Sequence, residues 1–198
     1  MADNLHKNRL YYAGTKWDGE ECVTEDMAYK LISWNIRGMH NMTKRHKVLS
    51  YIKRRGVHVA LLQETHLDET EGRALQKRWR GQIYYTKFSA FARGVLIWVR
   101  PGVPFQCVKS WVDPDGRYVA VTGRLGGRDL TLISIYAPNV EQSNFLTDLS
   151  GKLATCLTGP VVLGGDFNCI ANVSLDRSHP PLDRKSTRLN PVTAIDLV

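Results

Sequence analysis

Short apolar runs alternate with amphipathic stretches along most of the chain, and the alternation begins just after Met27. Short apolar runs predict buried strands, whereas apolar residues three or four positions apart predict helices with one buried face. Thr43 precedes one amphipathic stretch and can cap a helix that Gly56 ends. The pattern predicts helices over residues 43–55, 69–79 and 145–157, and strands over residues 29–34, 57–63, 83–88, 94–99, 105–111, 118–124, 130–136 and 161–163.

Some of the predicted strands are joined by helices and others by tight turns. Pro114-Asp115-Gly116 and Gly126-Gly127 are turn-forming sequences between successive apolar runs. A chain that combines helix-linked strands with hairpins is typical of layered α/β proteins. We therefore predict one mixed α/β domain over residues 27–182, preceded by an acidic leader of unassigned structure over residues 1–26.

Charge is distributed unevenly along the chain. Residues 27–182 hold 21 Lys and Arg against 11 Asp and Glu, a net charge of +10. Such a surplus favours a polyanionic partner, although a basic surface can also serve solubility alone. No apolar run approaches the roughly 18 residues of a membrane span, and the leader lacks the apolar core of a secretory signal. We expect a nuclear or cytoplasmic protein with no membrane partner.

Polar side chains recur where the predicted strands end. Asn35, Glu64, Tyr136 and Asp166 each follow an apolar run. Sites of open α/β sheets gather at strand ends, where rigid backbone aims side chains into a crevice. Taken singly, each residue has a plain structural explanation: a turn, a return to solvent, a packed aromatic ring or a helix cap. Their recurrence at four separate strand ends favours a functional site, to which Asn139 and Asn168 also belong.

These side chains suit metal-assisted hydrolysis of a phosphodiester. Carboxylate and amide oxygens are hard ligands that Mg²⁺ prefers, with Mn²⁺ as an alternative ion. A second carboxylate can activate water, while tyrosine and asparagine can donate hydrogen bonds to a phosphate oxygen. The chain contains no Gly-x-Ser-x-Gly elbow and no phosphate-binding Walker loop, which argues against a serine hydrolase and an NTPase.

Four short motifs together resemble the endonuclease/exonuclease/phosphatase superfamily. They are Ser33-Trp34-Asn35-Ile36-Arg37-Gly38, Leu62-Gln63-Glu64-Thr65-His66, Ile135-Tyr136-Ala137-Pro138-Asn139 and Gly165-Asp166-Phe167-Asn168. They occur in the family's order, and the second, the third and Leu175-Asp176-Arg177-Ser178 are most similar to endonucleases of LINE-type retrotransposons. The resemblance implies a four-layered α/β sandwich of the DNase I and exonuclease III kind.

The resemblance also implies a role for each site residue. Asn35 and Glu64 would lie near Mg²⁺, and Tyr136 and Asn139 would hold the scissile phosphate. Asp166 would orient or deprotonate the attacking water, with Asn168 positioning Asp166 and the phosphate. It further implies DNA as partner and a reverse transcriptase domain in full-length homologues. Trp34 and Phe167 are expected in the core, and His66 as a supporting polar residue.

The chain departs from the family pattern after the fourth motif. The family continues to a Ser-Asp-His motif, which the sequence does not contain. We therefore expect a partial domain with little activity. Residues 183–190 are also the translation of GATCGGAAGAGCACACGTCTGAAC, which resembles a sequencing-library adapter. Residues 183–198 are expected to be an artefactual tail on the surface, although an ordinary basic loop would have a similar composition.

The leading hypothesis is therefore an endonuclease that nicks DNA to start retrotransposition. Two alternatives within the same fold are an abasic-site nuclease like exonuclease III and a phosphoesterase for small molecules. An alternative of another class is a fragment that binds nucleic acid without cleaving it.

Overall fold

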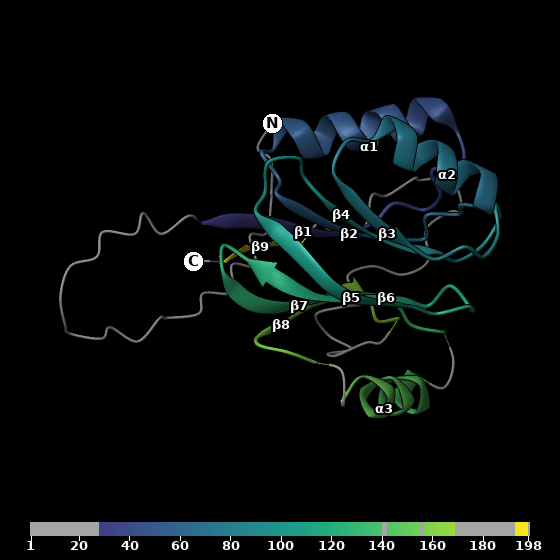
Figure 1. Ribbon diagram of the computed structural model, residues 1–198. Coiled ribbons are helices and arrows are strands. Elements are labelled where there is room, and N and C mark those ends of the chain that lie inside the picture. Colours follow the sequence, from purple (N-terminus) through teal and green to yellow (C-terminus); the bar gives the residue numbers. More distant parts are fainter. Residues whose placement is uncertain (1–27, 140–141, 155–156, 169–192, 198) are drawn as a thin grey trace, which may run out of the picture.

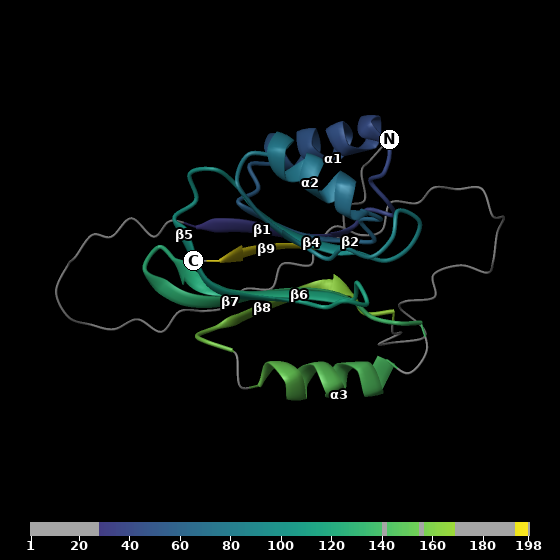
Figure 2. The same cartoon turned by 45° about the vertical axis from the view of Figure 1, so that its right-hand side comes forward.

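Two β-sheets face each other with helices on both outer sides (Figure 1). The computed structural model describes residues 28–139, 142–154, 157–168 and 193–197. Figure 2 shows the four layers edge on, with α1 and α2 above one sheet and α3 below the other. The predicted four-layered α/β sandwich is thereby confirmed. None of the helices in the described ranges is long and apolar enough to span a membrane.

The first sheet has the strand order β3-β4-β2-β1-β9. Strands β1 and β2 run parallel, and the other neighbours are antiparallel. Helices α1 and α2 cover its outer face (Figure 1). The elements of this half are β1 (Tyr29–Asn35), α1 (Met42–Arg54), β2 (Val59–Gln63), α2 (Glu69–Arg78), β3 (Gln82–Tyr85), β4 (Val95–Val99) and β9 (Thr193–Leu197).

The second sheet has the strand order β5-β6-β7-β8. Its antiparallel meander ends in one parallel pair, β7 with β8, and α3 supplies the crossover between these two strands. Helix α3 covers the outer face of this sheet (Figure 2). The elements are β5 (Phe105–Val112), β6 (Tyr118–Leu125), β7 (Arg128–Tyr136), α3 (Gln142–Leu153) and β8 (Val161–Asp166).

Three apolar layers separate the four structural layers. In β1, Leu31 belongs to the layer between the sheets, whereas its neighbour Ile32 belongs to the layer beneath α1 and α2. Successive side chains of a strand point to opposite faces, so a strand covered on both faces reads as a continuous apolar run. Trp34 lies in the outer layer as expected, and Phe167 packs against the layer beneath α3.

Several element boundaries differ from the sequence prediction. Asn41, not Thr43, caps α1, because its side chain accepts hydrogen bonds from the amides of Thr43 and Lys44. Asp68 forms a capping box with Glu71 at the start of α2. Strand β3 ends at residue 85 rather than 88, and α3 covers residues 142–153 rather than 145–157.

Strand β9 lies within the segment that we expected to remain outside the domain. It pairs antiparallel with β1, with Leu31 opposite Ile195. An uncovered strand edge presents free N–H and C=O groups, and these can pair with an extended segment of almost any sequence. The pairing places residues 193–197 at the edge of the first sheet, and residues 183–192 lie outside the described part, so the expected surface position of the segment stays a prediction. The adapter origin of the segment stays a prediction.

Candidate active site

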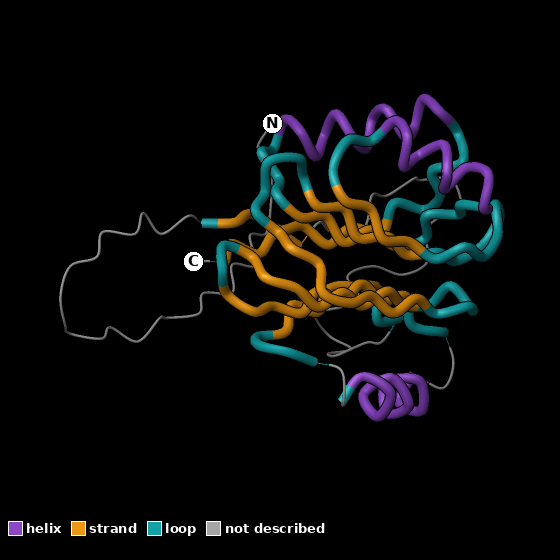
Figure 3. Tube along the Cα trace, viewed as in Figure 1, coloured by secondary structure: helices purple, strands orange, loops and turns teal. Residues whose placement is uncertain are grey.

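Four strands end together at one edge of the sandwich. Asn35 ends β1, and Glu64 follows the last residue of β2. Tyr136 and Asp166 end β7 and β8, where they are register partners. Parallel strands within each sheet bring the ends of both pairs to the same side, and the loops gather at that edge in Figure 3. The topology therefore brings residues from four sequence motifs to one place.

Asn35 joins the two sheets through its side-chain amide. Its Nδ2 donates to Glu64 Oε1 at 2.8 Å and to Asp166 Oδ2 at 2.6 Å. Its Oδ1 accepts the backbone N–H of Arg37 at 3.0 Å. The side chain is buried, with 6% of its surface exposed. A buried amide with both ends occupied holds its two carboxylate partners in a defined position.

Asp166 is held by further hydrogen bonds on its own side of the site. Its Oδ1 accepts the backbone N–H of Asn168 at 3.2 Å, and its backbone carbonyl accepts the N–H of Ala137 at 2.8 Å. The Asn168 Nδ2 donates to the carbonyl of Ala137 at 2.6 Å. Each carboxylate oxygen of Asp166 thus accepts a hydrogen bond, which fixes the orientation of the carboxylate.

Tyr136 lies beside both carboxylates. Burial raises the pKa of its hydroxyl, and the negative charges of Glu64 and Asp166 raise that pKa further. The Arg117 guanidinium, 5.4 Å from the centre of the Tyr136 ring, acts in the opposite direction. The hydroxyl therefore stays protonated at neutral pH and can donate a hydrogen bond.

Asn139 lines an open pocket with Glu64 and Tyr136. The structure thus brings together all six residues that the sequence predicted for the site, and their catalytic or binding roles stay predictions. Arg93 and Arg117 line the same pocket and were not anticipated. Arg117 directly follows the predicted turn at residues 114–116. That position next to a turn is the single feature of the sequence that could have suggested Arg117 as a site residue. The remaining lining residues are His66, Phe91 and Ala92.

Unusual backbone conformations are concentrated at this edge. Among the residues that the structure describes, every non-glycine residue with positive φ lies in a loop of the site. Such conformations cost about 1–3 kcal/mol each and persist where surrounding contacts enforce them. The residues are Arg37 (φ 49°), Glu64 (49°), His66 (52°), Arg93 (58°) and Asn168 (48°).

Backbone hydrogen bonds join these loops to one another. The Thr65 N–H donates to the carbonyl of Gly94 at 2.9 Å, and the Gly94 N–H donates to the carbonyl of Gly116 at 3.1 Å. The Tyr136 N–H donates to the carbonyl of Arg117 at 2.7 Å. Loops from both sheets are therefore tied into one rim, which fixes the backbone from which the site side chains project.

Two basic side chains lie close to Glu64. Burial lowers the pKa of His66, and the charge of Glu64 partly offsets this effect. The Nε2 of His66 lies 3.8 Å from Glu64 Oε2. Lys44 donates its Nζ to the carbonyl of Arg37 at 2.6 Å, and burial likewise lowers its pKa. His66 thus lies beside Glu64, and the supporting role expected of it from the sequence stays a prediction.

The family model described as Endonuclease/Exonuclease/phosphatase family matches residues 32–187, more than half of the chain. The chain belongs to this family. The endonuclease/exonuclease/phosphatase match spans all four motifs that carried the resemblance. It accounts for the two facing sheets and for the strand-end position of the site.

Known relatives include a protein of a mobile element. The chain is 26% identical over 145 residues to the transposon TX1 uncharacterized 149 kDa protein of Xenopus laevis, covering 72% of the chain and 11% of that protein. The chain thus spans about a tenth of this relative.

Several solved structures share the fold, and two of them illustrate the similarity to this chain. One is TDP2 from D. rerio complexed with a single-strand DNA product, with a TM-score of 0.58, 17% identity and coverage of 76% of this chain and 64% of that one. The other is the endonuclease domain of TRAS1, a telomere-specific non-LTR retrotransposon, with a TM-score of 0.53, 16% identity and coverage of 72% and 60%. Both structures have low sequence identity to this chain, and the likeness to them shows the shared fold.

Proposed function

We propose that this domain is a Mg²⁺-dependent endonuclease that nicks DNA for retrotransposition. The observation that carries the proposal is the shared hydrogen bonding of Asn35 to Glu64 and Asp166, with Tyr136 beside both carboxylates. The similarity to a transposon protein and to a retrotransposon endonuclease supports the choice of substrate. A DNA product in the TDP2 complex shows that this fold accommodates DNA in another protein.

The residues present fit a Mg²⁺ ion. Across the described ranges no group of three or more His, Cys, Asp and Glu side chains converges, and Mg²⁺ commonly needs only one or two carboxylates with several waters. Glu64 offers carboxylate oxygens at the wall of the open pocket, one of which accepts the Asn35 amide. Asn35 would be the second residue to hold the ion, next to Glu64. A bound Mg²⁺ or Mn²⁺ would supply charge stabilisation to the phosphate.

The other side chains supply positioning and proton transfer. Asp166 would accept a proton from the attacking water while Asn168 and Asn35 hold its carboxylate in place. The Tyr136 hydroxyl and the Asn139 amide would donate to non-bridging phosphate oxygens as negative charge develops. The new bond joins water oxygen to phosphorus, and the bond that breaks joins phosphorus to a bridging oxygen.

The proposed setting follows from the proposed substrate. The domain would be found in the nucleus or the cytoplasm. Full-length relatives would carry a reverse transcriptase domain. The basic surplus of residues 27–182 supports a polyanionic substrate.

Nicking of supercoiled plasmid tests the proposal. A version of the chain extended by a family-like segment with Ser-Asp-His should convert supercoiled to open-circular plasmid in Mg²⁺ and not in EDTA. Glu64→Gln and Asp166→Asn should each reduce the rate by at least about 10²-fold, whereas Glu69→Gln, at an exposed surface carboxylate, should not.

Other outcomes point to the alternatives. Cleavage only at abasic sites would indicate an abasic-site nuclease, and hydrolysis of small phosphoesters without nicking would indicate a phosphoesterase. If the extended protein bound DNA without hydrolysing it, the result would indicate a domain that binds nucleic acid without cleaving it. Each of these results contradicts the proposal.

A further inference from the structure

The loop between β3 and β4 carries an unusually exposed aromatic residue. Phe91 has 87% of its surface exposed, more than any other large apolar residue in the described part of the chain. Leaving a phenylalanine in water forgoes about 1.5–3 kcal/mol of burial free energy. Single exposed apolar residues are common on protein surfaces, so exposure alone assigns no role to Phe91.

The position of Phe91 is the second observation. Phe91 lines the same open pocket as Glu64, Tyr136 and Asn139. The exposed ring therefore stands next to the groups proposed to hold the scissile phosphate.

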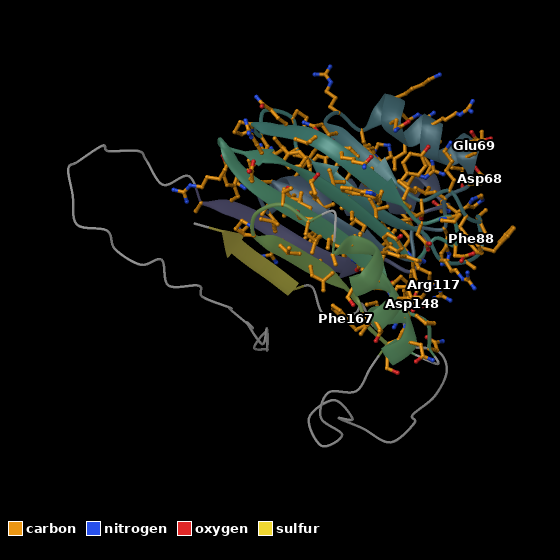
Figure 4. All side chains as sticks on the ribbon, turned by 60° about the horizontal axis from the view of Figure 1, so that its bottom comes forward. Asp68, Glu69, Phe88, Arg117, Asp148 and Phe167 are labelled. Atoms are coloured by element: carbon orange, nitrogen blue, oxygen red, sulfur yellow. The ribbon has the colours of Figure 1, made fainter. Side chains whose placement is uncertain are left out.

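The loop that carries Phe91 is braced at its base. Arg93 lies over the Phe88 ring, 4.6 Å from its centre, and donates its Nη1 to the carbonyl of Asp115 at 3.1 Å. Phe88 in turn packs closely on the backbone of Gly116. In Figure 4, Phe88 and Arg117 lie at the same end of the molecule. Phe88 and Arg93 thus anchor the loop, whereas the Phe91 side chain is exposed to solvent.

Aromatic and basic groups are combined in this pocket. Arg93 and Arg117 line it together with Phe91. Proteins that bind unpaired nucleic acid combine cationic groups for the phosphates with aromatic rings for the bases. A small phosphoester or a lipid headgroup offers the phosphate but no base for the ring.

We propose that Phe91 stacks on a nucleobase next to the scissile phosphate, so that the site takes DNA with an unstacked base rather than a small phosphoester. The inference rests on the proposed function and specifies its substrate. Phe91 is then a specificity-determining residue whose contribution depends on the presence of a base.

Binding measurements on the 198-residue chain test the proposal. The probe is a fluorescein-labelled single-stranded DNA oligonucleotide in EDTA and low salt, where nothing is cleaved, and the readout is fluorescence anisotropy. Phe91→Ala should weaken binding roughly fivefold to one-hundredfold, the range for loss of one base–aromatic stack. Phe91→Tyr should restore binding to near the original value, because tyrosine keeps the ring.

Two controls separate stacking from other effects. Val108→Ala, at an exposed apolar residue of β5 outside the pocket, should leave binding unchanged. On an oligonucleotide with the same phosphates but abasic spacers in place of nucleotides, the original chain and Phe91→Ala should bind equally, since no base is present. A loss of binding by Phe91→Ala on the abasic strand as well would show an effect on the fold or on charge and would overturn the proposal.

The outcomes also separate this inference from the proposed function. Equal binding of ordinary DNA by the original chain and Phe91→Ala would overturn the stacking role and leave plasmid nicking unaffected. No binding by the original chain, together with no nicking by the extended protein, would overturn both.

Discussion

Asn35 and Asp166 are 131 positions apart in the chain, and the Asn35 Nδ2 donates to Asp166 Oδ2 at 2.6 Å. The same nitrogen donates to Glu64, so one amide group lies between two carboxylates that would otherwise repel each other. This contact joins the two sheets at the edge where the candidate active site is formed.

Replacing Asn35 is expected to affect both stability and catalysis. Asn35→Ala removes a donor from two carboxylates, and hydrogen bonds to charged groups contribute about 1.5–3 kcal/mol. We expect a loss of that order in the free energy of unfolding, measured by urea denaturation in EDTA, and at least about 10²-fold slower nicking by the extended protein. Gln106→Ala, at an exposed amide on β5, should change the free energy by less than about 0.5 kcal/mol.

The chain as it stands is expected to nick DNA weakly. Its sequence contains no Ser-Asp-His motif, and loss of one main transition-state stabiliser typically costs about 10²–10³ in rate. Plasmid nicking by the 198-residue chain should therefore be slower by that factor than nicking by the extended version. Equal rates would show that the residues at the four strand ends suffice, and would contradict the expectation of a partial domain.

Strand β9 is expected to protect one side of β1. A chain that ends at residue 192 leaves the outer edge of β1 unpaired, since β2 occupies only its other side. Hydrogen–deuterium exchange should accelerate for the β1 amides that face β9, while peptides from β2 keep their protection. A strand edge without a partner can form hydrogen bonds with the same edge of another molecule. Light scattering should therefore detect more self-association. Unchanged exchange in β1 would mean that β9 does not pair stably in solution.

His58 is expected to make the stability depend on pH. Its Nδ1 accepts the backbone N–H of Lys30 at 2.9 Å, which requires an unprotonated nitrogen. Burial lowers the pKa of His58, and the charges of Arg100 and Lys30 lower it further. His58 therefore binds a proton more readily in the unfolded state than in the folded state. Its contribution to the free energy of unfolding is fully present at pH values above the unfolded pKa near 6.5.

As pH falls below about 6.5, this contribution to stability should be lost. Urea denaturation at pH 7.5 and pH 5.5 measures the difference, and His58→Gln should show a smaller decrease than the original chain. An equal decrease in both chains would assign the pH dependence to other groups.

Much of the layered fold could be predicted because both faces of the central strands are covered. The run Ala60–Leu62, and the run Leu31–Trp34 with Ser33 as its single polar residue, are recognisable without any partner, because burial on both faces favours apolar side chains at nearly every position. The precise ends of elements were less predictable. The capping bond of Asn41 to backbone amides shifts the start of α1, and neighbouring residue types do not distinguish Asn41 from Thr43 as the cap.

The sequence by itself determined the strand-end positions of six polar residues and the family to which their motifs belong. Tertiary structure alone decided that Asn35 bonds to both carboxylates, that Arg93 and Arg117 enter the same pocket, and that Phe91 stays exposed beside them. Strand periodicity is a local property, because it follows from side-chain burial along one element. Contacts across more than a hundred residues depend on how the two sheets pack against each other, and no local pattern encodes that packing.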